Sequence, residues 1–203
     1  GLYCGGWVFH NWCDANDIAD FFHSDVPLEV AFKPEDMKQP LAHYLVTGAI
    51  RWIMQGQPDF FTTPQSIGTT FPDPHSMLIN PATTTNVHWK YASMIMNIVR
   101  ESAGLVPYQV TERKWKVVRG QTKSEAEKYW DATKTHIPTF VTSELDLFQE
   151  VYDEVLQSHA DVENIRSRGG AGTVPPFGEV IDAIEAISPN ISLRVLNGNT
   201  KDR

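Results

Sequence analysis

The feature that most constrains the fold of this chain is the helical spacing of its apolar residues. Between Pro40 and Gln55, apolar residues recur at i, i+3, i+4 and i+7, which places them on one face of an α-helix. Other apolar residues cover much of the opposite side, so the pattern predicts a helix buried on two faces. Gly48 would let another backbone approach closely, and Gly56 followed by Pro58 predicts the end of the helix.

Further segments carry similar signals, and together they predict the fold class. Ser124 and Glu127 have the spacing of a capping box, which marks the start of a helix. The predicted helices after the first cover residues 84–104, 124–134, 143–168 and 176–187, with a short one at 16–22. Strands are predicted at residues 28–32, 108–118, 139–142 and 191–196. Since β-α-β alternation is absent, we expect a helix-rich α+β fold, with an all-α fold as the alternative.

The chain of 203 residues suits a single domain with two irregular segments. Residues 58–81 hold five prolines and almost no charge, which is typical of an extended arm docked on a neighbour or of a functional lid. Residues 166–176 begin with Arg166 and are rich in glycine, which predicts a hinge. We therefore expect one domain over residues 1–203, with an arm or loop at 58–81 and a hinge at 166–176.

Composition excludes several classes of protein. Hydrophobic residues make up 41% of the chain, enough for a core, so we expect a soluble folded protein. No stretch approaches the roughly 18 apolar residues of a membrane span. The first residue is Gly1 and not Met, which fits a processed mature form, a fragment or an engineered start equally well, and the sequence does not indicate a compartment or a cofactor.

The net charge of −8 is distributed unevenly along the chain. Residues 1–60 hold 3 bases and 8 acids, and residues 143–203 hold 5 bases and 11 acids, whereas residues 101–142 hold 7 bases and 5 acids. Basic groups beside aromatic rings suit a polyanion or an acidic partner. The candidate surface within residues 113–134 consists of Arg113, Lys114, Trp115, Lys116, Arg119 and Lys123. The alternatives are a half-buried strand with a solvated face and docking on an acidic patch of another copy.

Four zinc-competent side chains lie near the N-terminus: Cys4, His10, Cys13 and His23. Their spacing fits no common zinc finger. A disulfide between Cys4 and Cys13 and two inert thiols are therefore the competing interpretations.

Local catalytic motifs are missing from the sequence. There is no Gly-x-Ser-x-Gly elbow, no nucleotide-binding glycine loop and no His-Glu-x-x-His pair. An active site would have to combine dispersed residues near the 58–81 loop, with His75, Asp73 and His88 as the acid–base candidates and His43 as a further one.

Three other features favour structural roles. Residues 169–172 are rich in glycine but follow no predicted strand, which favours a hinge over a phosphate cradle. Glu150 and Glu154 lie away from the apolar stripe of their helix, which predicts a solvated acidic face. His159 lies on that stripe, which predicts a buried histidine with one hydrogen-bond partner.

These observations favour a non-catalytic structural or assembly subunit, such as a coat, shell or large-complex component, that associates with itself or with other protein subunits. The first alternative is an enzyme with an acid–base or metal site of dispersed residues. The second is nucleic-acid binding through residues 113–134. Two features favour assembly over both alternatives: the proline-rich arm with almost no charge, and the basic centre between acidic ends.

Overall fold

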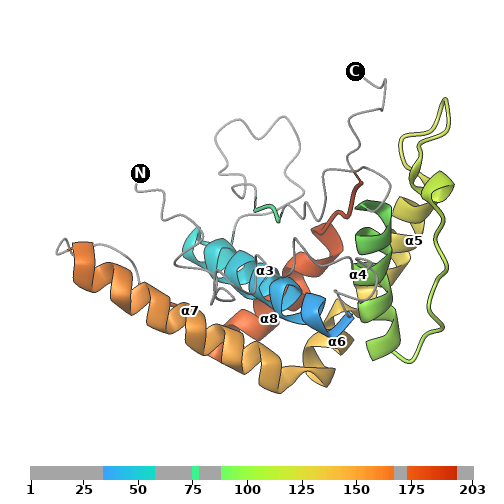
Figure 1. Cartoon of the computed structure of the whole chain (residues 1–203). Helices are drawn as coiled ribbons and strands as arrows, with labels where there is room; N and C mark the ends of the chain where they lie inside the picture. The colour runs from blue at the N-terminus through green and yellow to red at the C-terminus, as the bar shows by residue number, and fades with distance from the viewer. Residues whose placement is uncertain (1–33, 58–74, 78–87, 167–172, 196–203) are drawn as a thin grey trace, which may run out of the picture.

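The computed structural model describes residues 34–57, 75–77, 88–166 and 173–195, and every regular element in these ranges is helical (Figure 1). The prediction of an α+β fold is therefore wrong, and the all-α alternative fits the described part of the chain. The elements are α3 (Pro34–Met54), α4 (His88–Ser102), the 3₁₀ turn η2 (Glu112–Trp115), α5 (Glu125–Thr133), η3 (Lys134–His136), α6 (Ile137–Ser143), α7 (Leu145–Arg166), α8 (Phe177–Ile187) and η4 (Ser188–Asn190). None of these helices combines the length and apolar character that crossing a membrane requires.

Some predicted elements lie outside the described residues. These are the helix at 16–22, the strand at 28–32, most of the proline-rich segment, of which only 75–77 is described, and residues 167–172 of the glycine-rich segment.

Helix α3 lies at the centre of the fold and packs against α8, α7 and α4 (Figure 1). Its predicted burial on two faces is confirmed, because Leu45 on one stripe and Val46 on the other are both buried. The helix begins at Pro34, earlier than predicted, and runs through Pro40. Proline suits the first turn of a helix, where its missing N–H has no acceptor, so Pro34 is the better start signal of the two.

Two helices end at glycines as predicted. Gly56 has φ +80°, and its N–H donates to the carbonyl oxygen of Ile53 while the N–H of Gln57 donates to that of Trp52. Helix α4 ends in the same way at Gly104, which has φ +67°. This pair of hydrogen bonds is the Schellman motif, and its left-handed residue is most often glycine because glycine has no Cβ to clash.

The core joins α6, α7 and α8 to α3 and α4 in one cluster. At its centre Phe140 of α6 and Phe148 of α7 are both fully buried, with ring centroids 5.5 Å apart in an edge-to-face arrangement. Val151, Val180 and Ile184 are also fully buried beside them in this cluster. The interior is therefore built from apolar helix faces, as the periodicity predicted.

The strand predictions within the described ranges are wrong for local reasons. Residues 139–142 belong to α6, since Ile137, Phe140 and Val141 are buried at the i, i+3, i+4 spacing of a helix. In the 108–118 segment, residues 112–115 form the turn η2, and Trp115 turns inward. Residues 191–195 have no regular structure and alternate between half-buried and exposed, as a strand would, but no strand pairs with them among the described residues.

The capping box at the start of α5 is confirmed. The Ser124 hydroxyl accepts a hydrogen bond from the N–H of Glu127, and the Glu127 carboxylate accepts one from the N–H of Ser124. Ser124 is fully buried, so its loss cannot be compensated by water.

Replacing Ser124 with alanine is expected to lower the free energy of unfolding by about 1–2 kcal/mol, because the N–H of Glu127 in the first turn of α5 loses its acceptor. Equilibrium denaturation measures this, with Thr122→Ala, an exposed position just outside the helix, as the matched control. Equal stability of the two variants would contradict the capping role.

Candidate functional site

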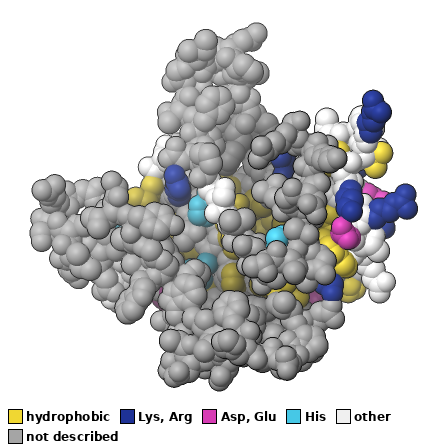
Figure 2. All heavy atoms as spheres, turned by 45° about the horizontal axis from the view of Figure 1, so that its top comes forward, with side chains coloured by type: hydrophobic (Ala, Val, Ile, Leu, Met, Phe, Trp, Pro, Cys, Tyr) yellow, Lys and Arg dark blue, Asp and Glu magenta, His cyan; other side chains and the backbone are white. Residues whose placement is uncertain are grey.

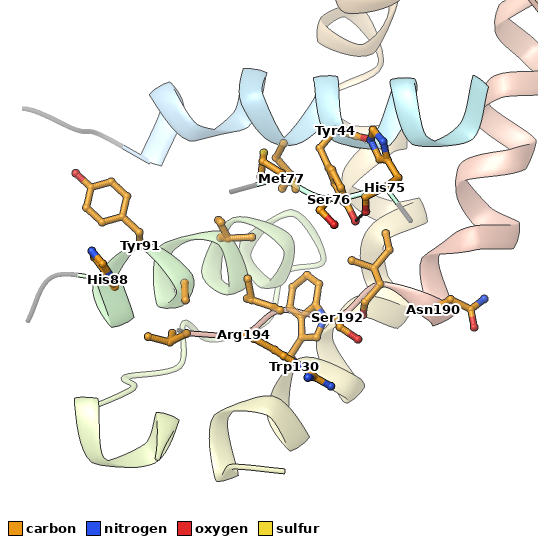
Figure 3. A pocket seen from close by; sticks show the side chains of 16 residues that line it. Tyr44, His75, Ser76, Met77, His88, Tyr91, Trp130, Asn190, Ser192 and Arg194 are labelled. Atoms are coloured by element: carbon orange, nitrogen blue, oxygen red, sulfur yellow. Dashed lines mark hydrogen bonds between the residues drawn. The ribbon is translucent and has the colours of Figure 1, made fainter. Parts of the chain in front are cut away.

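A pocket of about 620 Å³ lies between α3, α4, α5 and the segment after η4 (Figure 3). Its wall is formed by Leu41 and Tyr44 of α3, residues 75–77, the first two turns of α4, Trp130 of α5, and residues 190–195. Most of these side chains are aliphatic or aromatic, with a few histidine, hydroxyl and amide groups and the guanidinium of Arg194 among them. A concave, mainly apolar pocket with few polar groups is the usual form of a small-molecule site.

His75 is tied to α3 by its ring and its backbone. Its ring stacks on that of Tyr44, with centroids 4.9 Å apart and planes inclined by 15°. Its Nε2 lies 3.0 Å from the carbonyl oxygen of Tyr44, which can only accept, so Nε2 carries the proton. The Tyr44 hydroxyl in turn donates to the carbonyl oxygen of His75 at 3.3 Å. One edge of this imidazole is therefore occupied by structural contacts.

Gly48 allows this contact, because a Cβ at its position would lie 2.8 Å from Cδ2 of His75. The sequence predicted a close approach at Gly48, but the group that approaches is a side chain and not a backbone.

Replacing Gly48 with alanine is expected to destabilise the wild type by about 1 kcal/mol, because the His75 ring must move and lose its contacts. In a His75→Ala background the same change is expected to stabilise the protein by about 0.5–1 kcal/mol, the usual gain from glycine to alanine within a helix. Denaturant unfolding of the wild type, of Gly48→Ala, of His75→Ala and of the double variant measures the effect of Gly48→Ala in each background.

Gly178 of α8 is the matched control, since a Cβ there meets nothing within 4 Å. Gly178→Ala is expected to have the same effect in both backgrounds. A Gly48→Ala change that stabilises both backgrounds equally would contradict the proposed contact.

Burial lowers the pKa of His75 below its usual value, and the charge of Arg51 lowers this pKa as well. The hydrogen bond to Tyr44 raises the pKa but does not offset burial. A depressed folded-state pKa means that the unfolded chain takes up this proton first as the pH falls. The stabilising contribution is therefore present above the unfolded pKa of about 6.5 and is lost as the pH falls through the folded pKa.

We accordingly expect the wild type to lose stability between about pH 7 and 5 more steeply than His75→Gln does. Unfolding free energies measured at several pH values for both proteins give the two slopes. Parallel curves would show that His75 titrates alike in the folded and unfolded chains.

The predicted acid–base residues do not form a pair. His75 and His88 line the same pocket, but Figure 3 shows them at opposite ends of it. Asp73 lies outside the described residues. His43 faces α7 instead, where its Nε2 lies 2.8 Å from Oε2 of Glu154. Since general acid–base catalysis needs groups within hydrogen-bond reach of one reacting atom, this arrangement does not yet make a catalytic site.

The carboxylates of α7 match their prediction only in part. Glu150 is exposed, as expected for a solvated face, but Glu154 is half-buried against α3 through its contact with His43. The Nε2 atom of His159 is buried as predicted, but it has no hydrogen-bond partner among the described residues.

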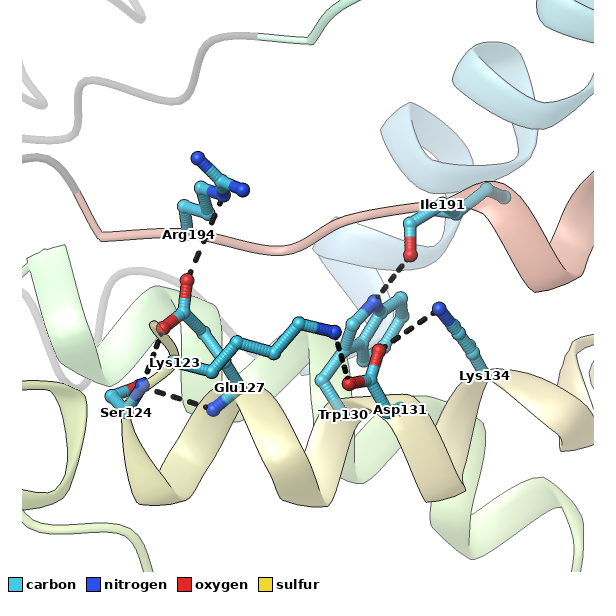
Figure 4. Close-up of polar contacts among 8 residues, drawn as sticks. All are labelled: Lys123, Ser124, Glu127, Trp130, Asp131, Lys134, Ile191 and Arg194. Carbon is cyan, nitrogen blue, oxygen red and sulfur yellow. Dashed lines mark hydrogen bonds and ion pairs between the residues drawn. The ribbon is translucent and has the colours of Figure 1, made fainter. Parts of the chain in front are cut away.

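Helix α5 holds the segment after η4 against the pocket (Figure 4). The indole Nε1 of Trp130 donates to the carbonyl oxygen of Ile191 at 2.9 Å. Nε of Arg194 lies 3.6 Å from Oε1 of Glu127, the residue that also closes the capping box. These contacts fix one wall of the pocket to the start and middle of α5.

Asp131 on the same helix accepts from the ammonium groups of Lys123 and Lys134 (Figure 4). Partial burial raises the pKa of Asp131, but the two ammonium groups together more than offset this effect, so the pKa lies below its usual value.

Much of the positive charge on the candidate partner or polyanion surface is paired with carboxylates within the fold. Trp115 is buried and its Nε1 donates to Oγ of Ser93, so its ring is not available for stacking on a base. Three of the basic candidates have carboxylate partners: Lys114 with Glu125, Lys116 with Glu112, and Lys123 with Asp131. The remaining two, Arg113 and Arg119, form no ion pair with any residue that the structure describes.

The sequence did not reveal the aromatic cluster beside this surface. The rings of Tyr108 and Tyr129 stack with centroids 3.7 Å apart, and Nζ of Lys114 lies 4.6 Å from the Tyr108 centroid. Hydrogen bonds to Tyr108 and Glu125 raise the pKa of Lys114. No short motif connects these residues, because three separate segments bring them together. The same is true of Tyr44, Trp130 and Ile191 in the pocket.

The candidate metal ligands Cys4, His10, Cys13 and His23 all lie outside the described residues. Within the described ranges, no three His, Cys, Asp or Glu side chains gather in a way that could hold a metal ion.

The fold and the site define, over the described ranges, an all-α protein with a mainly apolar pocket between α3, α4 and α5. Comparison of the chain with protein-family models, with curated proteins and with solved structures finds no match.

Proposed function

We propose that this chain is a non-catalytic assembly subunit, which docks on copies of itself through surfaces of opposite charge. The observation that carries the proposal is a division of charge between two parts of the fold. Residues 88–136, from α4 to η3, hold nine Lys and Arg against five Asp and Glu. Residues 137–166 together with 173–195, from α6 onward, hold two Lys and Arg against ten Asp and Glu.

Exposed charged side chains lie on both parts. Figure 2 shows most of the visible Lys and Arg at the right-hand edge of the face that it draws, with apolar atoms and a few carboxylates between them, and a few others elsewhere on that face. On α7 and α8 the exposed side chains include Glu150, Asp153, Asp182 and Glu185. Opposite charges on separate parts of one chain favour a head-to-tail contact between copies over a contact between identical surfaces.

The nucleic-acid alternative has less support than assembly. Free bases stack on exposed aromatic rings, whereas Trp115 and Trp130 are both buried and the exposed ring of Tyr129 already stacks on that of Tyr108. Lys114, Lys116 and Lys123 already have carboxylate partners, which reduces the gain from contacting phosphates.

The enzyme alternative keeps one supporting observation, the pocket that His75 and His88 both line. A screen of small molecules for thermal stabilisation tests it, with His75→Ala and His88→Ala as the variants. A compound that stabilises the wild type but neither variant would support this alternative. Identical responses of all three proteins would remove it.

Analytical ultracentrifugation of the purified chain over a range of concentrations tests the assembly function. We expect species larger than the monomer, whose fraction rises with concentration and falls with added salt, because exposed charges are screened beyond about 8 Å at physiological ionic strength. A strict monomer at every concentration would overturn the proposal.

A further inference from the structure

An ordered, exposed loop lies between η2 and α5, and we call residues 116–123 the Val117 loop. At its tip the N–H of Gln121 donates to the carbonyl oxygen of Val118 at 2.9 Å, and Gly120 has φ +85°. A hydrogen bond from i+3 to i with a left-handed residue at i+2 is the pattern of a type II β-turn. The tip therefore has a defined conformation before it meets any partner.

Both ends of the Val117 loop are anchored. Trp115, just before it, is buried in the core and bonded to Ser93. At the other end Lys123 pairs with Asp131, and Nζ of Lys128 donates to the Gln121 side chain at 3.1 Å. A preorganised loop loses little conformational entropy on binding, which suits it to docking.

The tip of this loop is apolar and basic. Val117 and Val118 are 45% and 63% exposed, and every residue of the loop is exposed. Arg119 has no ion pair with a described residue, and the two exposed valines lie next to it. A complementary partner surface would therefore present a carboxylate beside an apolar side chain.

The first turns of α7 offer that combination. Leu145 is 46% exposed there, while Asp146 and Glu150 are exposed and separated by one helical turn. Neither carboxylate forms an ion pair with a described residue. In Figure 1 the start of α7 and the Val117 loop lie on different sides of the molecule, so the two surfaces of one copy do not reach each other.

We propose that the Val117 loop of one copy docks on the first turns of α7 of a second copy, with Val117 and Val118 against Leu145 and with Arg119 facing Asp146 and Glu150. This inference rests on the proposed assembly function and names its interface. The contact is heterologous, because the Val117 loop of one copy binds a different surface, the first turns of α7, on the next copy. An unbound loop and an unbound α7 surface therefore remain at the two ends, and the assembly grows into a ring or a filament.

Charge reversal on each surface tests the pairing. The loop variant carries Arg119→Glu, and the acceptor variant carries Asp146→Lys and Glu150→Lys. Each is expected to weaken self-association at least about tenfold, because like charges then meet at the interface. A single chain with all three changes is expected to regain association to within about threefold of the wild type, since opposite charges face each other again.

The matched control reverses two exposed carboxylates of α8, Asp182→Lys and Glu185→Lys, which change the net charge as the acceptor variant does. This control is expected to associate like the wild type in sedimentation velocity. Circular dichroism on all variants checks that they fold.

The outcomes separate this inference from the proposed function. A wild type that never associates overturns both. A wild type that associates while the loop and acceptor variants behave like it overturns the interface alone. Loss in the single-surface variants without recovery in the combined chain also overturns the interface, because the two surfaces then do not face each other. Equal losses in the α8 control would indicate a general effect of charge, which overturns it as well.

Discussion

Replacing Phe148 with alanine is expected to lower the free energy of unfolding by about 3–5 kcal/mol, the usual cost of removing a buried phenyl ring. Phe148 is fully buried and its ring meets that of Phe140 edge to face. The two rings join α6 to α7, and the core around them reaches α3 and α8. The cavity left by the substitution would therefore lie where several helices meet, and chemical denaturation at low protein concentration measures the loss.

A double-mutant cycle with Phe140→Ala separates the ring contact from the loss of buried area. The two substitutions share one site, so their effects are expected to couple by about 0.5–1.5 kcal/mol. Leu145→Ala, at a half-exposed position on the same helix, serves as the control and is expected to change stability by about 0.5 kcal/mol or less. A cost for Phe148→Ala as small as that of the control would contradict the packing of α6 on α7.

Local signals were sufficient to predict the helices α3, α4, α5, α7 and α8 and several of their ends. The start of α5 depends on Ser124 and Glu127, which are three residues apart and whose side chains each accept a hydrogen bond from the other's backbone N–H. The ends of α3 and α4 depend on Gly56 and Gly104, whose φ angles are positive. Each of these signals acts within one turn of helix, so it can be read without knowledge of the rest of the fold.

The strand predictions were wrong because a short apolar run fits both the side-chain repeat of a β-strand and that of an α-helix. Residues 139–142 contain two threonines and a valine, which favour strands. Only the wider spacing of Ile137, Phe140 and Val141 reveals the helix, and Pro138 marks its first turn. Extended residues 191–195 keep the alternation of a strand, but the described fold presents helices to them and no neighbouring strand.

The pocket could not be predicted, because its residues come from segments far apart in the chain. His75 and His88 were candidates on their chemistry alone, and the sequence gives no sign that the ring of His75 stacks on Tyr44. Partners of the basic residues were equally hidden, since Lys123 and Asp131 are eight residues apart with a helix start between them. Charge counts along the chain therefore overstated how much of the basic segment is uncompensated.

Replacing Trp130 with alanine is expected to cost about 3–5 kcal/mol, because a buried indole ring is removed from between α5 and the pocket. Trp130→Phe keeps most of the ring but leaves the carbonyl oxygen of Ile191 without its donor, so it is expected to cost about 1–3 kcal/mol. Tyr129→Ala, next to it on the exposed face of α5, is the control and should cost less than either. Equilibrium unfolding ranks the three variants.

Hydrogen exchange then shows where the effect of Trp130→Phe is located. The indole hydrogen bond links α5 to a segment that no sheet supports among the described residues, so residues 191–195 depend on it more than the helices do. Their amides are expected to exchange faster in Trp130→Phe, while amides in the middle of α7 change only as far as global stability falls. A uniform acceleration over both regions would contradict this local role, because the indole would then stabilise the whole fold and not the wall of the pocket.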